Sequence, residues 1–189
     1  LERPSVLMVN PGPPRHEQRG VDENDTWVYL AGLFREIGVE APLIYGYDRS
    51  NGLILIEDLG DCLLQQAVLE KGPDSEWTAG TYRRLLDALL TIQFEGMRRL
   101  EENRLFNLAY TPDFMLRWEG LYFSAQFAGR LCGYTGPELE KELAALAALA
   151  GERMSGRVLI YRDFQSRNVM LGPDDILRFV DRSEERRVG

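Results

Sequence analysis

Three oxygen-bearing side chains near the C-terminal end of the chain lie at the edges of short apolar runs. Asp163 and Asn168 are five residues apart between the runs at Val158–Ile160 and Val169–Leu171, and Asp181 follows the next such run. One carboxylate can orient and deprotonate a hydroxyl group, while an amide and a second carboxylate can hold Mg²⁺ on the phosphates of ATP. The spacing predicts Asp163 as the base and Asn168 and Asp181 as the metal ligands.

The segments around these residues are predicted to be short strands. Val158–Ile160, Val169–Leu171 and Ile176–Val180 are β-prone, and the turn-forming residues 172 to 175 join the last two. A loop between strands followed by a hairpin leaves the polar residues at its rims. We therefore expect the three oxygens to converge.

The first third of the chain predicts a strand, a one-faced helix and a hairpin. Val6–Val9 reads as a strand, and the apolar positions from Trp27 to Ile37 recur at helical spacing before Gly38. Leu43–Tyr47 and Leu53–Glu57 are β-like runs separated by turn formers. From Asp58 onward the pattern becomes helical, so we place a boundary between residues 59 and 60.

Three helical stripes follow, and we expect all of them to form core. They comprise Tyr82, Leu85, Leu86, Leu89 and Leu90; then Pro112 to Tyr122 with Trp118 and Leu121; then Leu139, Leu143, Leu146 and Leu149. The order predicts an α+β protein with a small β-rich lobe at residues 1–59 and a mainly helical lobe at residues 60–181, separated by a cleft.

Composition excludes several classes of function. A net charge of -8 argues against nucleic acid as a partner, and no apolar run approaches the ~20 residues that cross a bilayer. Cys62 and Cys132 are far apart and belong to no metal-binding or redox motif, so we expect two reduced, packed thiols. We expect a soluble cytoplasmic monomer.

The segment from Tyr161 to Asn168 resembles the His-x-Asp-x-x-x-x-Asn loop that protein kinases share with the aminoglycoside phosphotransferase and choline kinase-like family. Tyr161 stands where the family has His, and Asp181 matches the aspartate that follows the loop. The sequence from Arg162 to Asn168 most resembles the corresponding loop of bacterial kinases that act on the cell-wall amino sugars N-acetylmuramate and N-acetylglucosamine.

The resemblance implies a protein-kinase-like two-lobed fold that uses ATP and Mg²⁺. Residues 53–61 resemble the last strand of the first lobe and the hinge, where backbone groups at Glu57, Asp58 and Leu59 would bind adenine. Residues 5–9 resemble the strand that carries an ATP-binding Lys in the family, but Met8 stands at that position.

The implied activity is transfer of the γ-phosphoryl group of ATP to a hydroxyl group of a sugar or amino sugar. Aminoglycoside antibiotics, choline and homoserine are alternative acceptors, and a pseudokinase-like nucleotide-binding module is an alternative that Met8 and Tyr161 motivate. Residues 182–189 resemble a translated sequencing adapter, so we expect the chain to be a fragment that is inactive by itself.

Overall fold

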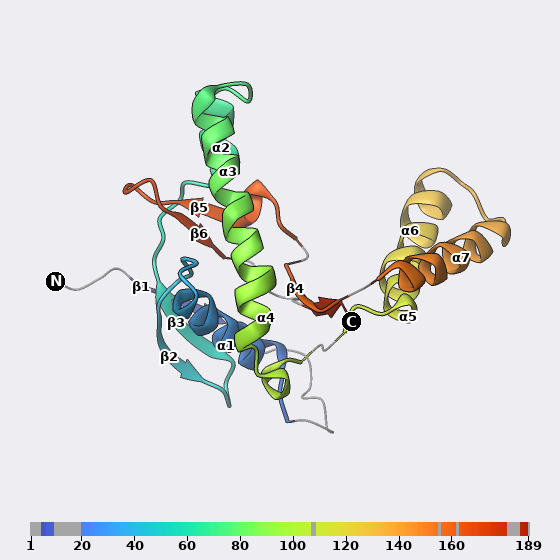
Figure 1. The fold of residues 1–189 in the computed structure, drawn as a ribbon, viewed down its shortest axis with the longest axis horizontal. Helices are drawn as coiled ribbons and strands as arrows, with labels where there is room; N and C mark the ends of the chain where they lie inside the picture. Colours follow the sequence, from blue (N-terminus) through green and yellow to red (C-terminus); the bar gives the residue numbers. More distant parts are fainter. Residues whose placement is uncertain are drawn as a thin grey trace. The chain divides into compact units, whose positions relative to one another are not determined.

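The computed structural model describes residues 5–9, 20–106, 109–154, 156–161, 163–180 and 186–188 of the chain (Figure 1). Helices and small sheets are mixed, which confirms the α+β class. Residues 1–108 and 159–186 form a first compact unit, and residues 109–158 and 187–189 form a second. The predicted lobes at 1–59 and 60–181 and the adapter-derived tail at 182–189 stay predictions.

A three-stranded antiparallel sheet opens the first unit. It contains β1 (Ser5–Val9), β2 (Ile44–Asp48) and β3 (Leu53–Glu57), in the order β1-β3-β2. The turn after β2 includes Gly52, whose φ of +64° suits a residue without a Cβ. The predicted hairpin is confirmed, and the register places Met8 opposite Ile54.

The helix α1 (Glu23–Glu36) follows the predicted position and ends as expected. Asp22 caps it through a reciprocal pair of hydrogen bonds with Asp25, and Gly38 has a φ of +82° just beyond its end. The buried Leu30, Leu33 and Phe34 recur at helical spacing on its inner face. The helix contacts β2 (Figure 1).

Two further helices of the first unit are joined by a short loop. They are α2 (Leu64–Lys71) and α3 (Glu76–Thr91), and α3 continues through the π-helical turn η1 (Ile92–Gly96) into α4 (Met97–Arg99). The short 3-10 turn η2 (Glu102–Arg104) comes next. A Cβ at Gly96 would lie 3.1 Å from the Leu159 side chain, so glycine permits the close approach of η1 to that residue.

The last part of the first unit contains the predicted short strands. They are β4 (Val158–Ile160), β5 (Val169–Leu171) and β6 (Leu177–Phe179), with the turn η5 (Ser166–Asn168) before β5. The strands β5 and β6 pair antiparallel, which confirms the predicted hairpin. A further short strand, β7 (Arg186–Val188), comes last in the chain.

One hydrophobic core joins these elements. Phe34 from α1, Leu64 from α2, Leu85 from α3 and Leu159 from β4 are almost fully buried in it. Val169 and Phe179 extend the same core into the β5–β6 hairpin. The strands that flank residues 161 to 168 are thus held by residues from three helices.

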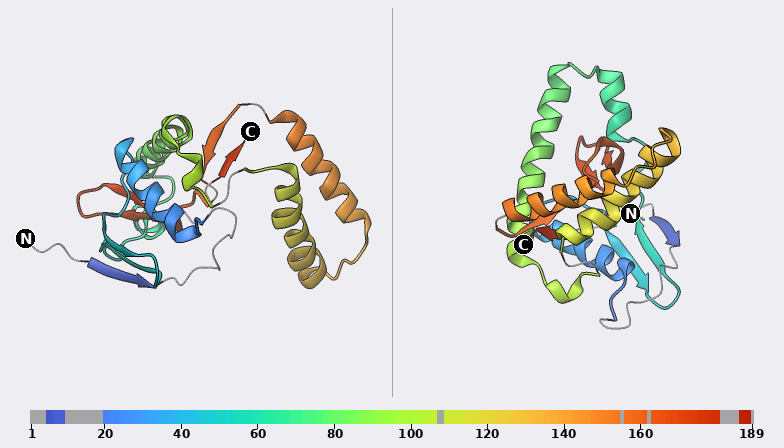
Figure 2. Two further views of the ribbon diagram at one scale, coloured as in Figure 1. Left: turned by 90° about the horizontal axis from the view of Figure 1, so that it is seen from below. Right: turned by 90° about the vertical axis from the view of Figure 1, so that its right-hand side faces the viewer.

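The second unit is a pair of helical segments (Figure 2). The first runs through α5 (Pro112–Phe114), η3 (Met115–Gly120), α6 (Leu121–Phe123) and η4 (Ser124–Leu131), and the second is α7 (Glu138–Arg153). The side chain of Thr111 accepts a hydrogen bond from the Phe114 amide, and Pro112 occupies the first helical turn.

The prediction that all three stripes form core is wrong for much of their length. In α3, Leu85 is 3% exposed, but Tyr82, Leu86 and Leu90 are 43%, 55% and 52% exposed. Residues four apart share one line along a helix, so these three form a line beside the buried one. The neighbours of α3 cover only one of the two lines.

The same correction applies to the second unit and to the cysteines. Trp118, Leu121, Tyr122, Leu146 and Leu149 are all exposed. Two helical segments can cover only the faces that they turn toward each other. Cys62 and Cys132 are also exposed, so the prediction of packed thiols is wrong.

Candidate catalytic site

The loop between β4 and β5 brings two of the predicted catalytic residues together. The side chain of Asp163 is exposed in the turn after β4, and Asn168 is half-buried at the end of η5. The Nδ2 atom of Asn168 donates a hydrogen bond of 3.0 Å to the backbone carbonyl of Asp163. The Asn168 amide closes the turn on the Gln165 carbonyl at 2.9 Å. The side chain of Asn168 therefore fixes the backbone from which Asp163 projects.

The end of β6 lies beside the same turn. The amide of Val180 donates to the Asn168 carbonyl at 3.1 Å, and the indole Nε1 of Trp27 donates to the Val180 carbonyl at 3.4 Å. Asp181, the second predicted metal ligand, comes directly after Val180 but lies outside the described residues. Its place in the site stays a prediction.

Four aromatic rings pack together beside the loop that joins β4 to β5. Tyr161 is 5% exposed, and its ring centroid lies 6.3 Å from that of Phe34 on α1. Phe164 and Phe179 stack on each other at 5.8 Å, and each meets Tyr161 at 5.6 and 6.0 Å, respectively. Such ring pairs add about 0.5 to 1.5 kcal/mol each beyond their area burial. Along the chain, Asp163 thus lies between two residues, Tyr161 and Phe164, whose rings belong to this cluster.

The other side of the loop rests on α2 and the segment that leads into it. Arg167 Nε donates to Gln65 Oε1 at 3.2 Å, and the amide of Leu171 donates to the Cys62 carbonyl at 2.9 Å. Leu63 forms an isolated β-bridge with Met170. The chain that follows the predicted hinge is therefore tied to β5.

The predicted hinge lies at the end of β3. The amide of Glu57 donates to the Leu43 carbonyl at 2.9 Å, and its carboxylate accepts from the Leu43 amide at 3.2 Å. Asp58 is exposed and accepts from the Gly60 amide at 2.9 Å, while Leu59 is half-buried. The Glu57 amide is thus used within the fold, so a ligand would have to meet the remaining backbone groups of this segment.

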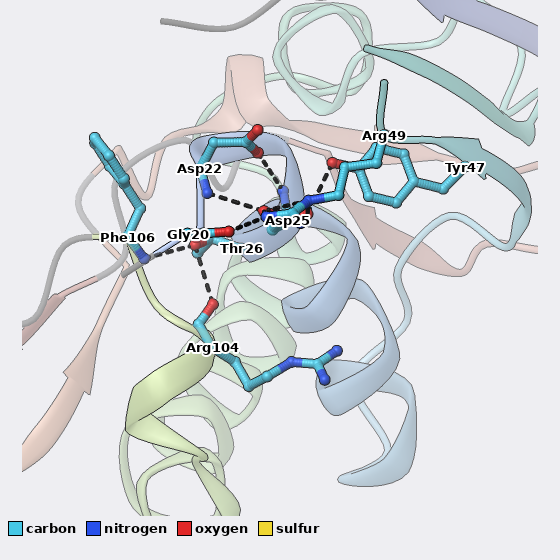
Figure 3. Close-up of polar contacts among 8 residues, drawn as sticks. All are labelled: Gly20, Asp22, Asp25, Thr26, Tyr47, Arg49, Arg104 and Phe106. Atoms are coloured by element: carbon cyan, nitrogen blue, oxygen red, sulfur yellow. Dashed lines mark hydrogen bonds and ion pairs between the residues drawn. The ribbon is translucent and has the colours of Figure 1, made fainter. Parts of the chain in front are cut away.

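A polar cluster ties the start of α1 to the hairpin turn (Figure 3). Arg49 Nε contacts both Asp25 carboxylate oxygens at 2.7 and 3.0 Å, and its Nη2 lies 2.6 Å from Oδ2. The Tyr47 hydroxyl donates to Asp25 Oδ1 at 3.0 Å, and the Asp22 amide donates to Oδ2 at 2.9 Å. Arg49 also donates to the Gly20 carbonyl.

Burial and hydrogen bonding act in opposite directions on the Asp25 carboxyl. Burial alone raises its pKa, but the hydrogen bonds from Arg49, the Asp22 backbone and Tyr47 outweigh that effect and hold the pKa below its ordinary value. Burial and the hydrogen bond to Asp25 together raise the pKa of the Tyr47 hydroxyl far above its usual range. The cluster therefore favours a charged Asp25 and a neutral Tyr47.

Thr26 ties α1 to a different part of the first unit. Its hydroxyl donates to the Arg104 carbonyl at 3.2 Å and accepts from the Phe106 amide at 2.7 Å (Figure 3). The side chain is 6% exposed, so both bonds are shielded from water. The N-terminal turn of α1 is thus held on two sides.

The chemistry of the loop fits a magnesium nucleotide. Because Nδ2 of Asn168 binds the Asp163 carbonyl, Oδ1 is the atom with which this side chain would bind a cation, and an amide oxygen suits Mg²⁺. Within the described ranges, no group of three or more His, Cys, Asp or Glu gathers to hold a metal ion. The sequence prediction that Asn168 and Asp181 together hold the metal ion stays a prediction.

Sequence reasoning missed Trp27, Phe34 and the Asp25–Arg49 pair as parts of the site's support. Trp27 and Phe34 were identified only as members of an apolar stripe, and a stripe does not say which residues it will meet. The capping box was visible as Asp22 followed three residues later by Asp25. The sequence did not predict a partner for Arg49, because an Arg in a turn is ordinarily solvated.

Comparisons with known proteins point to a kinase. The sequence matches no protein-family model. It is 29% identical over 187 residues to the N-acetylmuramate/N-acetylglucosamine kinase of Pseudomonas aeruginosa, an alignment that covers 94% of this chain and 48% of that protein. The chain therefore spans about half the length of this relative. The relationship is to a kinase that acts on amino sugars.

None of the helices that the structure describes combines the length and the apolar character that a bilayer crossing requires.

Proposed function

We propose that the protein is an ATP-dependent kinase that transfers the γ-phosphoryl group to a hydroxyl group of a sugar or amino sugar. Asp163 takes the proton of the acceptor hydroxyl while the oxygen of that hydroxyl bonds to the γ-phosphorus. The bond between the γ-phosphorus and the bridging oxygen of the β-phosphate breaks, which releases ADP. Asn168 and Asp181 hold Mg²⁺. Backbone groups at Glu57, Asp58 and Leu59 bind the adenine.

The observation that carries this proposal is the hydrogen bond from the side-chain Nδ2 of Asn168 to the backbone carbonyl of Asp163. It joins the proposed base and a proposed metal ligand in one short loop, while the Asp163 carboxylate remains exposed. Phosphoryl transfer depends mainly on positioning and on charge stabilisation, so a rigid loop of this kind suits it. The amino-sugar kinase to which the chain is related supports the choice of acceptor.

The proposal includes the family and the fold that the loop suggests. We assign the chain to the aminoglycoside phosphotransferase and choline kinase-like family, with a protein-kinase-like two-lobed fold, ATP and Mg²⁺ as its requirements and a cytoplasmic monomer as its state. Aminoglycosides, choline and homoserine remain the alternative acceptors.

A nucleotide-binding module without turnover is the second candidate. Met8 favours it, because this apolar residue stands where the resemblance implies a phosphate-binding Lys. Met8 lies opposite Ile54 in the pairing of β1 with β3. Such a module would bind MgATP through the same loop and hinge. The two candidates differ only in turnover.

The experiment is a panel of amino sugars, sugars, aminoglycosides, choline and homoserine, assayed for ADP release by the full-length gene product. Wild type is compared with Asp163→Asn, which keeps the size of the side chain and removes the base. We expect turnover with an amino sugar and a loss of about 10²- to 10⁴-fold in kcat for the variant. Full activity of Asp163→Asn would exclude Asp163 as the base, and MgATP binding without turnover by wild type would favour the second candidate.

A further inference from the structure

We infer that Trp27 is a positioning residue for the catalytic loop, through a chain of hydrogen bonds that starts on α1 and ends at Asp163. This inference rests on the proposed kinase function. Its effect on Asp163 and Asn168 passes through the backbone of Val180.

The chain of hydrogen bonds has three steps. The Trp27 indole donates to the Val180 carbonyl at 3.4 Å, and the Val180 amide donates to the Asn168 carbonyl at 3.1 Å. The Asn168 side-chain amide then donates to the Asp163 carbonyl at 3.0 Å. Both polar groups of Val180 are therefore engaged, one by the helix and one by the loop.

The first step is longer than a typical N–H···O hydrogen bond, so it is the weakest of the three. The indole is a rigid donor with one N–H, which can approach the Val180 carbonyl from only one direction. A displaced Val180 would move the carbonyl of Asn168, because the intervening bond is between backbone atoms. Asn168 would then carry the change to the Asp163 backbone.

The helix that carries Trp27 is held in place at both ends. Asp25 is bound by Arg49 and Tyr47 at its start, and Phe34 packs against Tyr161 near its end. Beyond α1, the Glu40 carbonyl accepts a hydrogen bond of 3.0 Å from the Phe179 amide, one residue before Val180. Two hydrogen bonds thus connect the end of β6 to α1 and to the segment just after it, one between Trp27 and Val180 and one between Phe179 and Glu40.

The consequence concerns metal and phosphate positioning more than nucleotide affinity. Adenine contacts at residues 57 to 59 lie on β3 and the segment after it, which the Trp27 chain does not reach. A metal ligand whose supporting hydrogen bond is lost binds its ion less well, at a cost that is typically about 10- to 100-fold. Trp27 lies two hydrogen bonds away from Asn168, so we expect an effect at or below the lower end of that range.

The test is Trp27→Phe in the full-length gene product, which removes the N–H group and keeps an aromatic ring. Trp77→Phe is the matched control, because Trp77, like Trp27, is a partly buried indole of the first unit. Initial rates are measured against Mg²⁺ at saturating ATP, together with KM for ATP and thermal unfolding. Arg49→Ala is a second variant, because it loosens the start of α1 from an exposed position.

We expect Trp27→Phe to raise the Mg²⁺ concentration at half-maximal rate by about three- to tenfold and to lower kcat, with KM for ATP within about twofold. Arg49→Ala should move the same parameters less, and Trp77→Phe should move only the unfolding temperature. An unchanged Mg²⁺ dependence in folded Trp27→Phe, or the same shift in Trp77→Phe, overturns the inference while the kinase function stands. Absence of turnover in wild type overturns both.

Discussion

The side-chain amide of Asn168 is bound to the backbone carbonyl of Asp163, at 3.0 Å, across a loop of five residues. An Asn at this position can serve two purposes at once, since its nitrogen secures the loop and its oxygen can meet a cation. The spacing of the two residues in the sequence is the spacing that this bond requires. It is the relationship on which the proposed chemistry depends most.

Separating the two purposes of Asn168 gives the first prediction. Asn168→Ala removes both, and we expect the Mg²⁺ concentration at half-maximal rate to rise by about tenfold or more, with a large fall in kcat. Asn168→Asp keeps an oxygen ligand but lacks the N–H that binds Asp163. It should therefore retain Mg²⁺ affinity while kcat falls. Initial rates measured at several Mg²⁺ concentrations would distinguish the two variants. A wild-type Mg²⁺ dependence for Asn168→Ala would show that Asn168 is not a metal ligand.

The cluster at Asp25 gives a prediction about pH. The ordinary pKa of an Asp is 3.8, and that of Asp25 is lower in the folded protein. As the pH falls, the unfolded chain takes up the proton first, so the free energy of unfolding declines from about pH 5 downward. The stabilisation that the charged Asp25 contributes is fully present at neutral pH. There, Asp25→Asn should lower the free energy of unfolding by about 1 to 2 kcal/mol.

Urea unfolding at pH 7 and near pH 3.5 measures this effect. The difference between wild type and Asp25→Asn should shrink at the lower pH, because wild type loses the stabilisation that the variant already lacks. Arg98→Ala is the control: it removes an exposed ion pair with Glu95 one turn away on a helix, and it should change little at either pH. A gap that stays constant between the two pH values would contradict the lowered pKa.

Thr26 gives a third prediction, because its hydroxyl serves two backbone groups at once. Thr26→Val keeps the shape of the side chain but leaves the Arg104 carbonyl and the Phe106 amide without this partner. We expect a loss of about 1 to 3 kcal/mol in the free energy of unfolding. Thr91→Val is the matched control, since Thr91 binds only the Asp87 carbonyl of its own helix. Equal costs for the two variants would show that the long-range bonds contribute little.

The elements of this fold were predictable from the sequence where local signals agree. Gly38 marks the end of α1, the turn formers at residues 49 to 52 separate β2 from β3, and residues 172 to 175 join β5 to β6. In each case a backbone requirement selects the residue type. The hydrogen bond between Asn168 and Asp163 was not predicted; the sequence predicted only that the two residues lie near each other in one short loop.

Contacts between distant segments were not predictable in this way. The Trp27 indole meets Val180 from 153 positions away, and the Arg49 guanidinium meets Asp25 across a helix and a strand. Neither residue type at its position signals a partner. An apolar stripe likewise says that a helix has a favoured face, but not how wide a face its neighbours will cover.

The two leucines at positions 85 and 86 test that last point. They are adjacent in α3 and were both predicted to be core, yet Leu85 is 3% exposed and Leu86 is 55% exposed. Leu85→Ala should destabilise the protein by about 2 to 5 kcal/mol, because it removes buried groups and leaves a cavity. Leu86→Ala should stay within about 0.5 kcal/mol of wild type, since alanine favours the helix and little burial is lost. Urea unfolding of the two variants in parallel decides the matter, because they share helix, chemistry and neighbours in sequence. If Leu86→Ala costs as much as Leu85→Ala, then the line through Tyr82, Leu86 and Leu90 is covered in solution and the original prediction of a fully buried stripe is restored.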